Sequence, residues 1–213
     1  MKGLIDGARR ATYSLSRFAA RITAVVLFQI RCEGRENYPQ SGAALVCANH
    51  QSYLDPVLVG LTCDRQLNYL ARKSLFRFVP FRWLIQWYDA IPIEREGLGI
   101  GGLKETLRRL RRGEMVLLFP EGTRTRDGEV APLQPGFCTL ARRGRAAIVP
   151  VAIDGAYQAW PRSRLLPWRS AIHIQVGSAI TFDELQRLTD AQLVAELQSR
   201  LASCHASVKA SRS

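Results

Sequence analysis

Short apolar runs separated by amphipathic stretches are the feature that most constrains the fold of this sequence. The runs lie at residues 43–48, 115–119, 146–153 and 172–176. Runs of this length are typical of strands buried inside a sheet. Two weaker strand candidates lie at residues 67–71 and 88–93. Pro150 weakens the end of the third run, because proline cannot donate a hydrogen bond to a neighbouring strand.

The segments between these runs have helical patterns. They lie at residues 56–61, 81–87, 100–112, 137–143, 182–187 and 191–204. Thr181, and either Thr189 or Asp190, are the expected N-caps of the last two. Strands that alternate with helices predict an α/β fold, a single domain whose mixed, largely parallel sheet is flanked by helices. The 213 residues suit one such domain better than two. We expect it at residues 33–208, with a tail at 209–213.

The N-terminal segment, residues 1–32, is predicted to be an amphipathic helix. Apolar residues follow a helical stripe through residues 4–30, with four arginines between them. Such a helix either lies in the headgroup layer of an anionic membrane or packs on the core of its own domain. The sequence pattern favours the membrane-bound helix and the packed helix equally. Its longest apolar stretch, residues 22–30, is too short to cross a bilayer, which takes about 20 residues.

The strongly basic composition implies an anionic partner. Thirty Lys and Arg face 18 Asp and Glu, a formal net charge of +12, and lysine stands only at positions 2, 73, 104 and 209. A genome rich in guanine and cytosine would explain the preference for arginine over lysine, but not the net charge. Nucleic acid, an acidic membrane or a phosphorylated substrate would each fit. The sequence contains no helix-turn-helix signature, zinc-ligand spacing or aromatic-rich RNA-binding strand, which disfavours nucleic acid.

The five cysteines predict neither disulfides nor a zinc site. They are scattered, odd in number and include no C-x-x-C pair. Cys47 and Cys138 lie among apolar residues, so we expect both to be small buried side chains. A reducing compartment, the cytosolic side of a membrane, suits such a chain.

A His–Asp pair follows the first apolar run. Residues 49–56 read NHQSYLDP, which places His50 five positions before Asp55. In α/β sheets the loop that leaves the carboxyl end of a strand is where ligands bind. A neutral imidazole there can accept a proton from a hydroxyl, and a carboxylate can orient it. Because no G-x-S-x-G motif is present, the pair suggests attack by the substrate's own hydroxyl. The spacing alone is common by chance and would favour an ordinary surface histidine.

A second polar loop follows the run at 115–119. Residues 119–128 read FPEGTRTRDG, and their two arginines, hydroxyls and flexible glycine suit a phosphate oxyanion. A solvated turn is the alternative. Arg95, after IPIE, is a third basic residue at a predicted strand end. It either binds an anion or pairs with Glu94 or Glu96.

Taken together, these motifs resemble the 1-acyl-sn-glycerol-3-phosphate acyltransferase family, within the wider glycerolipid acyltransferases. NHQSYLD matches the family's N-H-x-S-x-x-D motif, IPIER its second motif, FPEGTRT its third and VPVAI its fourth. Lys73, in ARKSLF, also stands where the family often has lysine. The ordered match covers residues 43–153, with the first and third motifs about 65 residues apart, and is far more specific than either motif alone.

The resemblance implies a role for each matched residue. His50 would be the general base and Asp55 would orient it. The acceptor hydroxyl would attack the thioester of acyl-CoA or acyl-carrier protein, giving phosphatidic acid from 1-acyl-sn-glycerol-3-phosphate. The remaining matched residues would bind the phosphate or shape the acceptor site: Lys73, Arg95, Glu121, Gly122, Thr123 and Arg124. No metal or redox cofactor is implied. The enzyme would be a peripheral or monotopic membrane protein on the cytoplasmic face.

Two departures from the family pattern leave the acceptor open. The family commonly has a basic residue just before the glycine that follows the third motif, but residues 133–136 read LQPG here, and residues 89–92 replace the usual glycine and aromatic of the second motif. A different lysolipid, such as an amino-acid-linked one, is therefore an alternative acceptor. A basic protein that only binds nucleic acid or anionic membranes is the alternative from another class. A lipid-binding protein with a dead site is disfavoured by the intact His50–Asp55 pair.

Three further features have weaker interpretations. Three arginines at positions 162, 164 and 169 bracket two leucines and Trp168, which suggests either a membrane-interface patch or a packed loop. His173 alternates within a predicted strand and is expected to be structural. His205 falls near the C-terminus, with no partner identifiable from the sequence.

Overall fold

The computed structural model describes residues 28–72, 91–93 and 99–212. The predicted N-terminal helix lies almost entirely outside these residues. The expected helix at 81–87 lies outside them as well, as do Lys73 and Arg95.

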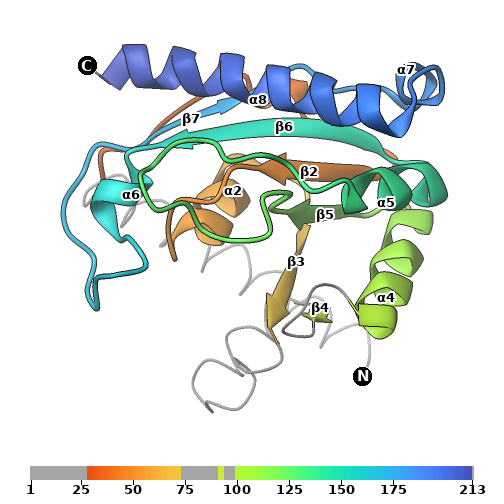
Figure 1. The fold of residues 1–213 in the computed structure, drawn as a ribbon, viewed down its shortest axis with the longest axis horizontal. Helices are drawn as coiled ribbons and strands as arrows, with labels where there is room; N and C mark the ends of the chain where they lie inside the picture. The colour runs from red at the N-terminus through yellow and green to blue at the C-terminus, as the bar shows by residue number, and fades with distance from the viewer. Residues whose placement is uncertain (1–27, 73–90, 94–98, 213) are drawn as a thin grey trace, which may run out of the picture.

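A seven-stranded mixed sheet forms the centre of the domain (Figure 1). Its order is β1-β7-β6-β2-β5-β3-β4, and every neighbouring pair is parallel except β6 and β7. The strands are β1 (Arg31–Glu33), β2 (Ala44–Ala48), β3 (Leu67–Arg72), β4 (Ile91–Ile93), β5 (Met115–Leu118), β6 (Ala147–Asp154) and β7 (His173–Val176). The predicted fold class, an α/β domain with a mixed and largely parallel sheet, is confirmed.

Helices cover both faces of this sheet. They are α2 (Asp55–Thr62), α4 (Gly99–Arg111), α5 (Gly136–Gly144), α6 (Ala156–Ala159), α7 (Phe182–Gln186) and α8 (Asp190–Arg212), with a 3-10 turn, η1 (Arg35–Asn37). In Figure 1, α8 lies along one face, above β6, and α2 lies on the other. None of the described helices is long and apolar enough to cross a membrane.

The side chains of β2 show how completely both faces are buried. Ala44, Val46 and Ala48 join a hydrophobic cluster with α2 and α6, while Leu45 and Cys47 join a second cluster with α4, α5, α7 and α8. All five are fully buried. Complete burial of one large apolar side chain contributes about 1.5–3 kcal/mol. An uninterrupted apolar run is therefore what this central strand requires.

Most predicted strands are confirmed, and one was missed. The four apolar runs became β2, β5, β6 and β7; of the weaker candidates, 67–71 became β3, which runs one residue further, and 88–93 contains β4. The missed strand, β1, has three residues that alternate between exposed and half-buried. Its parallel pairing with β7 makes it a strand, and no apolar run signals it. Arg31 and Cys32 therefore belong to the sheet, and the expected segment boundary after residue 32 is wrong at this point.

Pro150 lies inside β6 and does not end it. On one side it is in register with Cys47 of β2. On the other side the regular pairing with β7 begins at Val151; before it, the Pro150 carbonyl accepts the N–H of Gly177 at 2.9 Å and an isolated bridge joins Ile148 to Ile180. Pro150 therefore falls where the β7 side of the ladder is interrupted, which is a position that tolerates a residue without an N–H group.

The C-terminal helix is longer than expected. We predicted a helix at 191–204 and a tail from Lys209, but α8 runs to Arg212. Lys209 forms an ion pair with Glu129, Arg212 forms one with Asp154, and Val208 is buried. The tail prediction is wrong because these contacts across the fold hold the last turns of the helix. The cap predictions are confirmed: Thr181 forms a capping box, and Thr189 accepts the N–H of Gln192.

Candidate active site

Two parallel neighbours, β2 and β5, bring the two motif-bearing loops to one edge of the sheet. Cys47 is in register with Leu118, so the chain leaves both strands at the same level. The backbone N–H of His50 donates to Glu121 Oε1 at 2.9 Å, and the N–H of Thr125 donates to the His50 carbonyl at 2.8 Å. The two loops, about 65 residues apart in sequence, therefore form one site.

His50 and Asp55 are directly hydrogen-bonded. His50 Nδ1 lies 2.7 Å from Asp55 Oδ2. Asp55 is the first residue of α2, where the partial positive charge of the helix terminus favours a carboxylate. With Nδ1 held by the carboxylate, the ring nitrogen left to accept a proton is Nε2. This is the orientation that a histidine base needs.

The backbone around Asp55 holds its carboxylate in place. Oδ2 also accepts hydrogen bonds from the N–H groups of Gln51 at 2.6 Å and Ser52 at 2.7 Å. Asp55 is fully buried, and this burial raises its pKa; the hydrogen bonds from His50, Ser52 and Gln51 oppose the rise. The second oxygen, Oδ1, is buried with no hydrogen-bond partner among the described residues. All donors therefore converge on the one oxygen that orients His50.

Phe119 sets the plane of the His50 ring. The two rings stack with centroids 4.0 Å apart and planes inclined by 17°. The His50 side chain is 20% exposed, so one part of the imidazole is open to a substrate while its face is covered. We expected Phe119 only as part of a strand and motif; its stacking role was missed, since ring contacts depend on loop geometry.

A cation lies in the loop that is bonded to the His50 carbonyl. The guanidinium carbon of Arg124 lies 3.6 Å from the centroid of the Tyr53 ring, within cation–π range. Tyr53 in turn contacts Trp160, with ring centroids 5.3 Å apart. Arg124 Nη1 is buried without a hydrogen-bond partner in the described part of the chain. An arginine N–H in this state can bind an anion, because a buried donor without a partner is costly.

The other predicted site residues are placed as follows. Gly122 has a φ of 75° and its N–H donates to the Phe119 carbonyl, so this tight turn requires glycine. Thr123 is exposed in the same turn, next to Glu121 and Arg124. Lys73 and Arg95 lie outside the described residues, so their places in the site stay predictions. In the described segments, no group of three or more His, Cys, Asp or Glu side chains could hold a metal ion.

Comparisons with known proteins show the family of this chain. The acyltransferase family model matches residues 29–154. A 1-acyl-sn-glycerol-3-phosphate acyltransferase of Bacillus subtilis is 31% identical over 143 residues, which are 65% of this chain and 71% of that enzyme. The chain belongs to the 1-acyl-sn-glycerol-3-phosphate acyltransferase family.

Two further relatives bear on the length and the fold. A chloroplastic family member of Arabidopsis thaliana is 28% identical over 74% of this chain, which spans 45% of that protein. The crystal structure of the 1-acyl-sn-glycerophosphate acyltransferase of Thermotoga maritima superimposes with a TM-score of 0.84. The superposition covers 96% of this chain and 83% of the Thermotoga maritima chain, at 22% sequence identity. At that identity the likeness concerns the fold alone.

Asn49, the first residue of the family's first motif, has a structural role. It is fully buried, its Nδ2 donates to the Ile153 carbonyl at 2.9 Å, and its Oδ1 accepts the Ile153 N–H at 2.7 Å. This pair of bonds joins the end of β2 to β6. Asn49 therefore holds the start of the His50 loop against the neighbouring strand.

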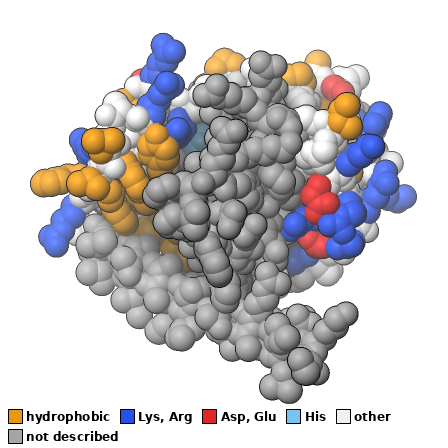
Figure 2. Space-filling model, turned by 90° about the horizontal axis from the view of Figure 1, so that it is seen from below, with side chains coloured by type: hydrophobic (Ala, Val, Ile, Leu, Met, Phe, Trp, Pro, Cys, Tyr) orange, Lys and Arg blue, Asp and Glu red, His pale blue; other side chains and the backbone are white. Residues whose placement is uncertain are grey.

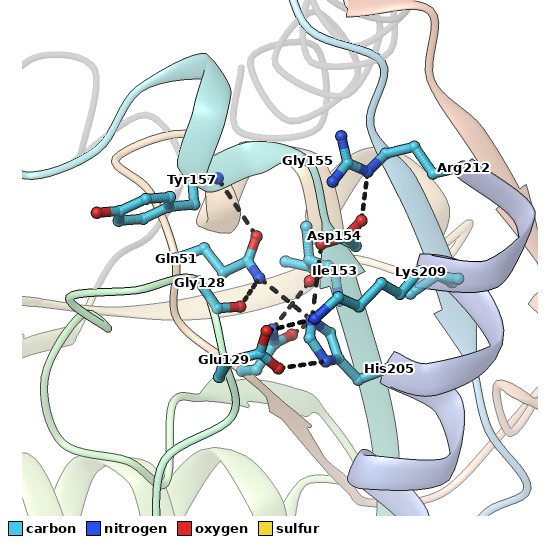
Figure 3. Close-up of polar contacts among 12 residues, drawn as sticks. Gln51, Gly128, Glu129, Ile153, Asp154, Gly155, Tyr157, His205, Lys209 and Arg212 are labelled. Carbon is cyan, nitrogen blue, oxygen red and sulfur yellow. Dashed lines mark hydrogen bonds and ion pairs between the residues drawn. The ribbon is translucent and has the colours of Figure 1, made fainter.

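Gln51 joins the same loop to α8, beyond the segment that the family model matches (Figure 3). Its Nε2 donates to the Gly128 carbonyl and lies 3.3 Å from His205 Nε2, and its Oε1 accepts the Tyr157 N–H at 3.3 Å. The sequence offered no partner for His205 because Gln51 is 154 residues away. The loop is thus held from both sides, because Asn49 bonds to Ile153 of β6 and Gln51 contacts His205 of α8.

His205 is buried in this network, which disfavours its charged form. Burial lowers its pKa, against the opposing effect of two carboxylates, Asp154 and Glu129. Its two ring nitrogens lie 3.7 Å from Asp154 and 3.8 Å from Glu129 (Figure 3). The expectation that His173 is structural agrees with its burial and with a 2.9 Å hydrogen bond between Nδ1 and Ser211.

Glu121 makes the stability of the fold depend on pH. Burial raises its pKa from 4.5 to about 7, although the N–H groups of His50 and Ala131 oppose the rise. The neutral form is therefore favoured in the folded state. The stability that this provides is fully present below about pH 4.5 and is lost as the pH rises through about 7.

Replacing Glu121 with glutamine is expected to remove this dependence. The amide stays neutral at every pH and can still accept the N–H of His50. Relative to Glu121→Gln, the wild type should lose about 1–2 kcal/mol of unfolding free energy between pH 4.5 and 7. Urea unfolding across this range measures the difference. Parallel pH curves for the two proteins would contradict the prediction.

Proposed function

We propose that this protein transfers a fatty acyl group from a thioester to the free hydroxyl of a lysophospholipid. The donor is acyl-CoA or acyl-carrier protein, and the acceptor is 1-acyl-sn-glycerol-3-phosphate, which becomes phosphatidic acid. The observation that carries the proposal is His50, held by buried Asp55 through Nδ1. The loop bonded to the His50 carbonyl carries Arg124, one of whose N–H groups has no hydrogen-bond partner among the described residues. Family membership supports the same reaction type.

His50 acts as the general base in this proposal. Nε2 takes the proton of the acceptor hydroxyl while the oxygen attacks the thioester carbonyl. The imidazolium that forms is stabilised by the Asp55 carboxylate across the 2.7 Å hydrogen bond. When the tetrahedral intermediate collapses, the C–S bond breaks and the thiolate takes the proton from His50. The products are a free thiol and an ester, and the base returns to its neutral form without a cofactor.

Arg124 binds the acceptor's phosphate in this proposal. Its guanidinium is fixed over Tyr53, and one N–H points to no described partner. Lys73 and Arg95 would add further positive charge, while Glu121, Gly122 and Thr123 would shape the turn that carries Arg124. A phosphate held here lies next to the base, which would orient the neighbouring hydroxyl for attack.

The reaction is tested by thiol release from a long-chain acyl-CoA, with and without lysophosphatidic acid. Release that requires the acceptor, together with phosphatidic acid in the lipid extract, is the expected result. The same assay with an acyl-carrier protein donor and with an amino-acid-linked lysolipid identifies the actual pair of substrates. Absence of acceptor-dependent release with every combination would contradict the proposal and favour a binding protein.

Replacing Arg124 with alanine is expected to weaken use of the phosphorylated acceptor. The KM for lysophosphatidic acid should rise on the order of 10- to 100-fold, since a hydrogen bond to a charged group contributes about 1.5–3 kcal/mol. The rate at saturation and the KM for an unphosphorylated monoacylglycerol should change little. Arg126→Ala is the matched control, because Arg126 is exposed two residues further along the same loop. An equal effect of both substitutions would contradict the role of Arg124.

The proposed substrates place the protein at a membrane surface, on its cytoplasmic face. The net charge of +12 favours attraction to anionic lipid headgroups. We also assign membrane contact to the N-terminal segment, which its basic amphipathic sequence supports.

A further inference from the structure

The loop that connects α6 to β7 exposes large apolar side chains. Leu165 is 92% exposed, Leu166 74% and Trp168 72%. We refer to residues 161–169 as the Trp168 loop. Isolated exposed hydrophobic residues are common, but three within four positions form a surface that calls for a partner.

Hydrogen bonds hold the Trp168 loop in a defined shape. The N–H of Trp168 donates to the Ala159 carbonyl at 2.8 Å, which closes the loop against α6. Trp160 Nε1 donates to the Arg164 carbonyl at 3.1 Å, and Arg164 Nη1 donates to the Gln158 carbonyl at 3.1 Å. The apolar side chains are therefore presented outward by a braced backbone.

The charges around the Trp168 loop suit an anionic surface. Arg162, Arg164 and Arg169 are exposed, and the sequence contains no Asp or Glu from residue 155 to residue 182. Figure 2 shows hydrophobic side chains projecting from the side of the molecule where this loop lies, with basic side chains at their edges. Trp and Leu flanked by Arg are typical of a segment that lies at the interface between lipid headgroups and acyl chains.

The Trp168 loop is also attached to the candidate active site. The Ser52 hydroxyl donates to the Trp160 carbonyl at 2.8 Å. The Tyr53 ring, over which the Arg124 guanidinium lies, contacts the Trp160 ring. Tyr53 and Val57 are themselves about half exposed. Exposed apolar surface is therefore found on both sides of the Trp160 contact, on the loop and on the segment that holds His50 and Asp55.

We propose that the Trp168 loop docks on an anionic lipid bilayer. Leu165, Leu166 and Trp168 enter the boundary of the acyl chains, while Arg162 and Arg169 contact the headgroup phosphates. The catalytic dyad is thereby held beside the surface from which a lipid acceptor reaches it. The claim that the His50–Asp55 pair is held beside the lipid surface of its acceptor rests on the proposed function. The docking of the loop does not, because it is measured by binding.

Fluorescence quenching tests whether Trp168 enters the bilayer. Vesicles of equal parts phosphatidylglycerol and phosphatidylcholine carry bromine on their acyl chains, and the difference between the wild type and Trp168→Phe isolates the Trp168 emission. Strong quenching of this difference is expected, and it should disappear with unbrominated lipid. This readout is independent of the affinity contributed by the N-terminal segment. An unquenched Trp168 in vesicle-bound protein would overturn the proposal.

Vesicle partitioning tests whether the loop contributes affinity. A variant with Leu165→Ser, Leu166→Ser and Trp168→Ser should bind anionic vesicles on the order of 10-fold more weakly, because it loses buried apolar area. Arg162→Glu with Arg169→Glu should weaken binding to anionic vesicles more than to neutral ones. Ile100→Ser and Arg111→Glu, at exposed positions on α4, are the matched controls and should bind as the wild type does.

Two further outcomes separate this proposal from its alternatives. The serine variant should keep wild-type thiol release with short-chain, water-soluble substrates, so lost activity there would indicate a damaged fold or site. If Trp168 stays unquenched and the serine variant instead loses self-association in sedimentation, the loop is an interface between copies of the chain. Failure of acyl transfer altogether would leave the quenching result, and thus the docking, intact.

Discussion

Replacing His50 with alanine is expected to lower acyl transfer by about 10³-fold or more, since the change removes both the general base and its orientation by Asp55. Asp55 keeps its two backbone N–H donors after the change. The fold should therefore survive, with a loss of about 1–2 kcal/mol in the free energy of unfolding. Thiol release with lysophosphatidic acid, together with circular dichroism and urea unfolding, measures the two effects.

His50→Gln is the more conservative test of the same role. A glutamine amide can donate to Asp55 and pack against Phe119, but it has no basic nitrogen where Nε2 stands. Its activity should be as low as that of His50→Ala, while its stability should be closer to that of the wild type. Either variant retaining more than about a tenth of the wild-type rate would rule out His50 as the base.

The second large effect is expected for Asp55→Asn. The neutral amide cannot stabilise the imidazolium, so turnover should fall by about 10²- to 10⁴-fold. Two backbone N–H groups and His50 converge on Oδ2. An amide nitrogen there would oppose these donors, at a cost of about 1–3 kcal/mol of stability.

A double mutant shows whether the two residues act together. If Asp55 works only through His50, then His50→Ala with Asp55→Asn should be no slower than His50→Ala alone. Asp183→Asn is the matched control, since Asp183 is an exposed acid in the first turn of α7, as Asp55 is a buried one in α2. It should leave the rate unchanged. Multiplicative losses in the double mutant would mean that Asp55 has a role separate from orienting the base.

The architecture was readable from the sequence wherever the signal was local. A central strand covered by helices on both faces must be apolar at every position, so the apolar run that includes Leu45 and Cys47 predicted β2. Likewise Thr181 and Thr189 cap helices through contacts only three residues long. The His50–Asp55 pair belongs to this class as well, because both residues lie within one strand–loop–helix connection.

The contacts that make a site of these motifs were decided by the tertiary structure. β1 is a strand only because β7 pairs with it, and α8 continues past Lys209 only because Glu129 and Asp154 lie beside it. The stacking of Phe119 on His50 and the bond from Gln51 to His205 join residues 69 and 154 positions apart.

One physical reason separates the features that the sequence predicted from those that the tertiary structure decided. Burial pattern, capping and turn chemistry act over a few residues, so the sequence alone determined six of the seven described strands, most of the helices and the position of the His50–Asp55 pair. Ring stacking, buried hydrogen bonds and the docking of a terminal helix depend on which distant segments the sheet order brings together. Those contacts, and with them the burial that raises the pKa values of Asp55 and Glu121, only the tertiary structure decided.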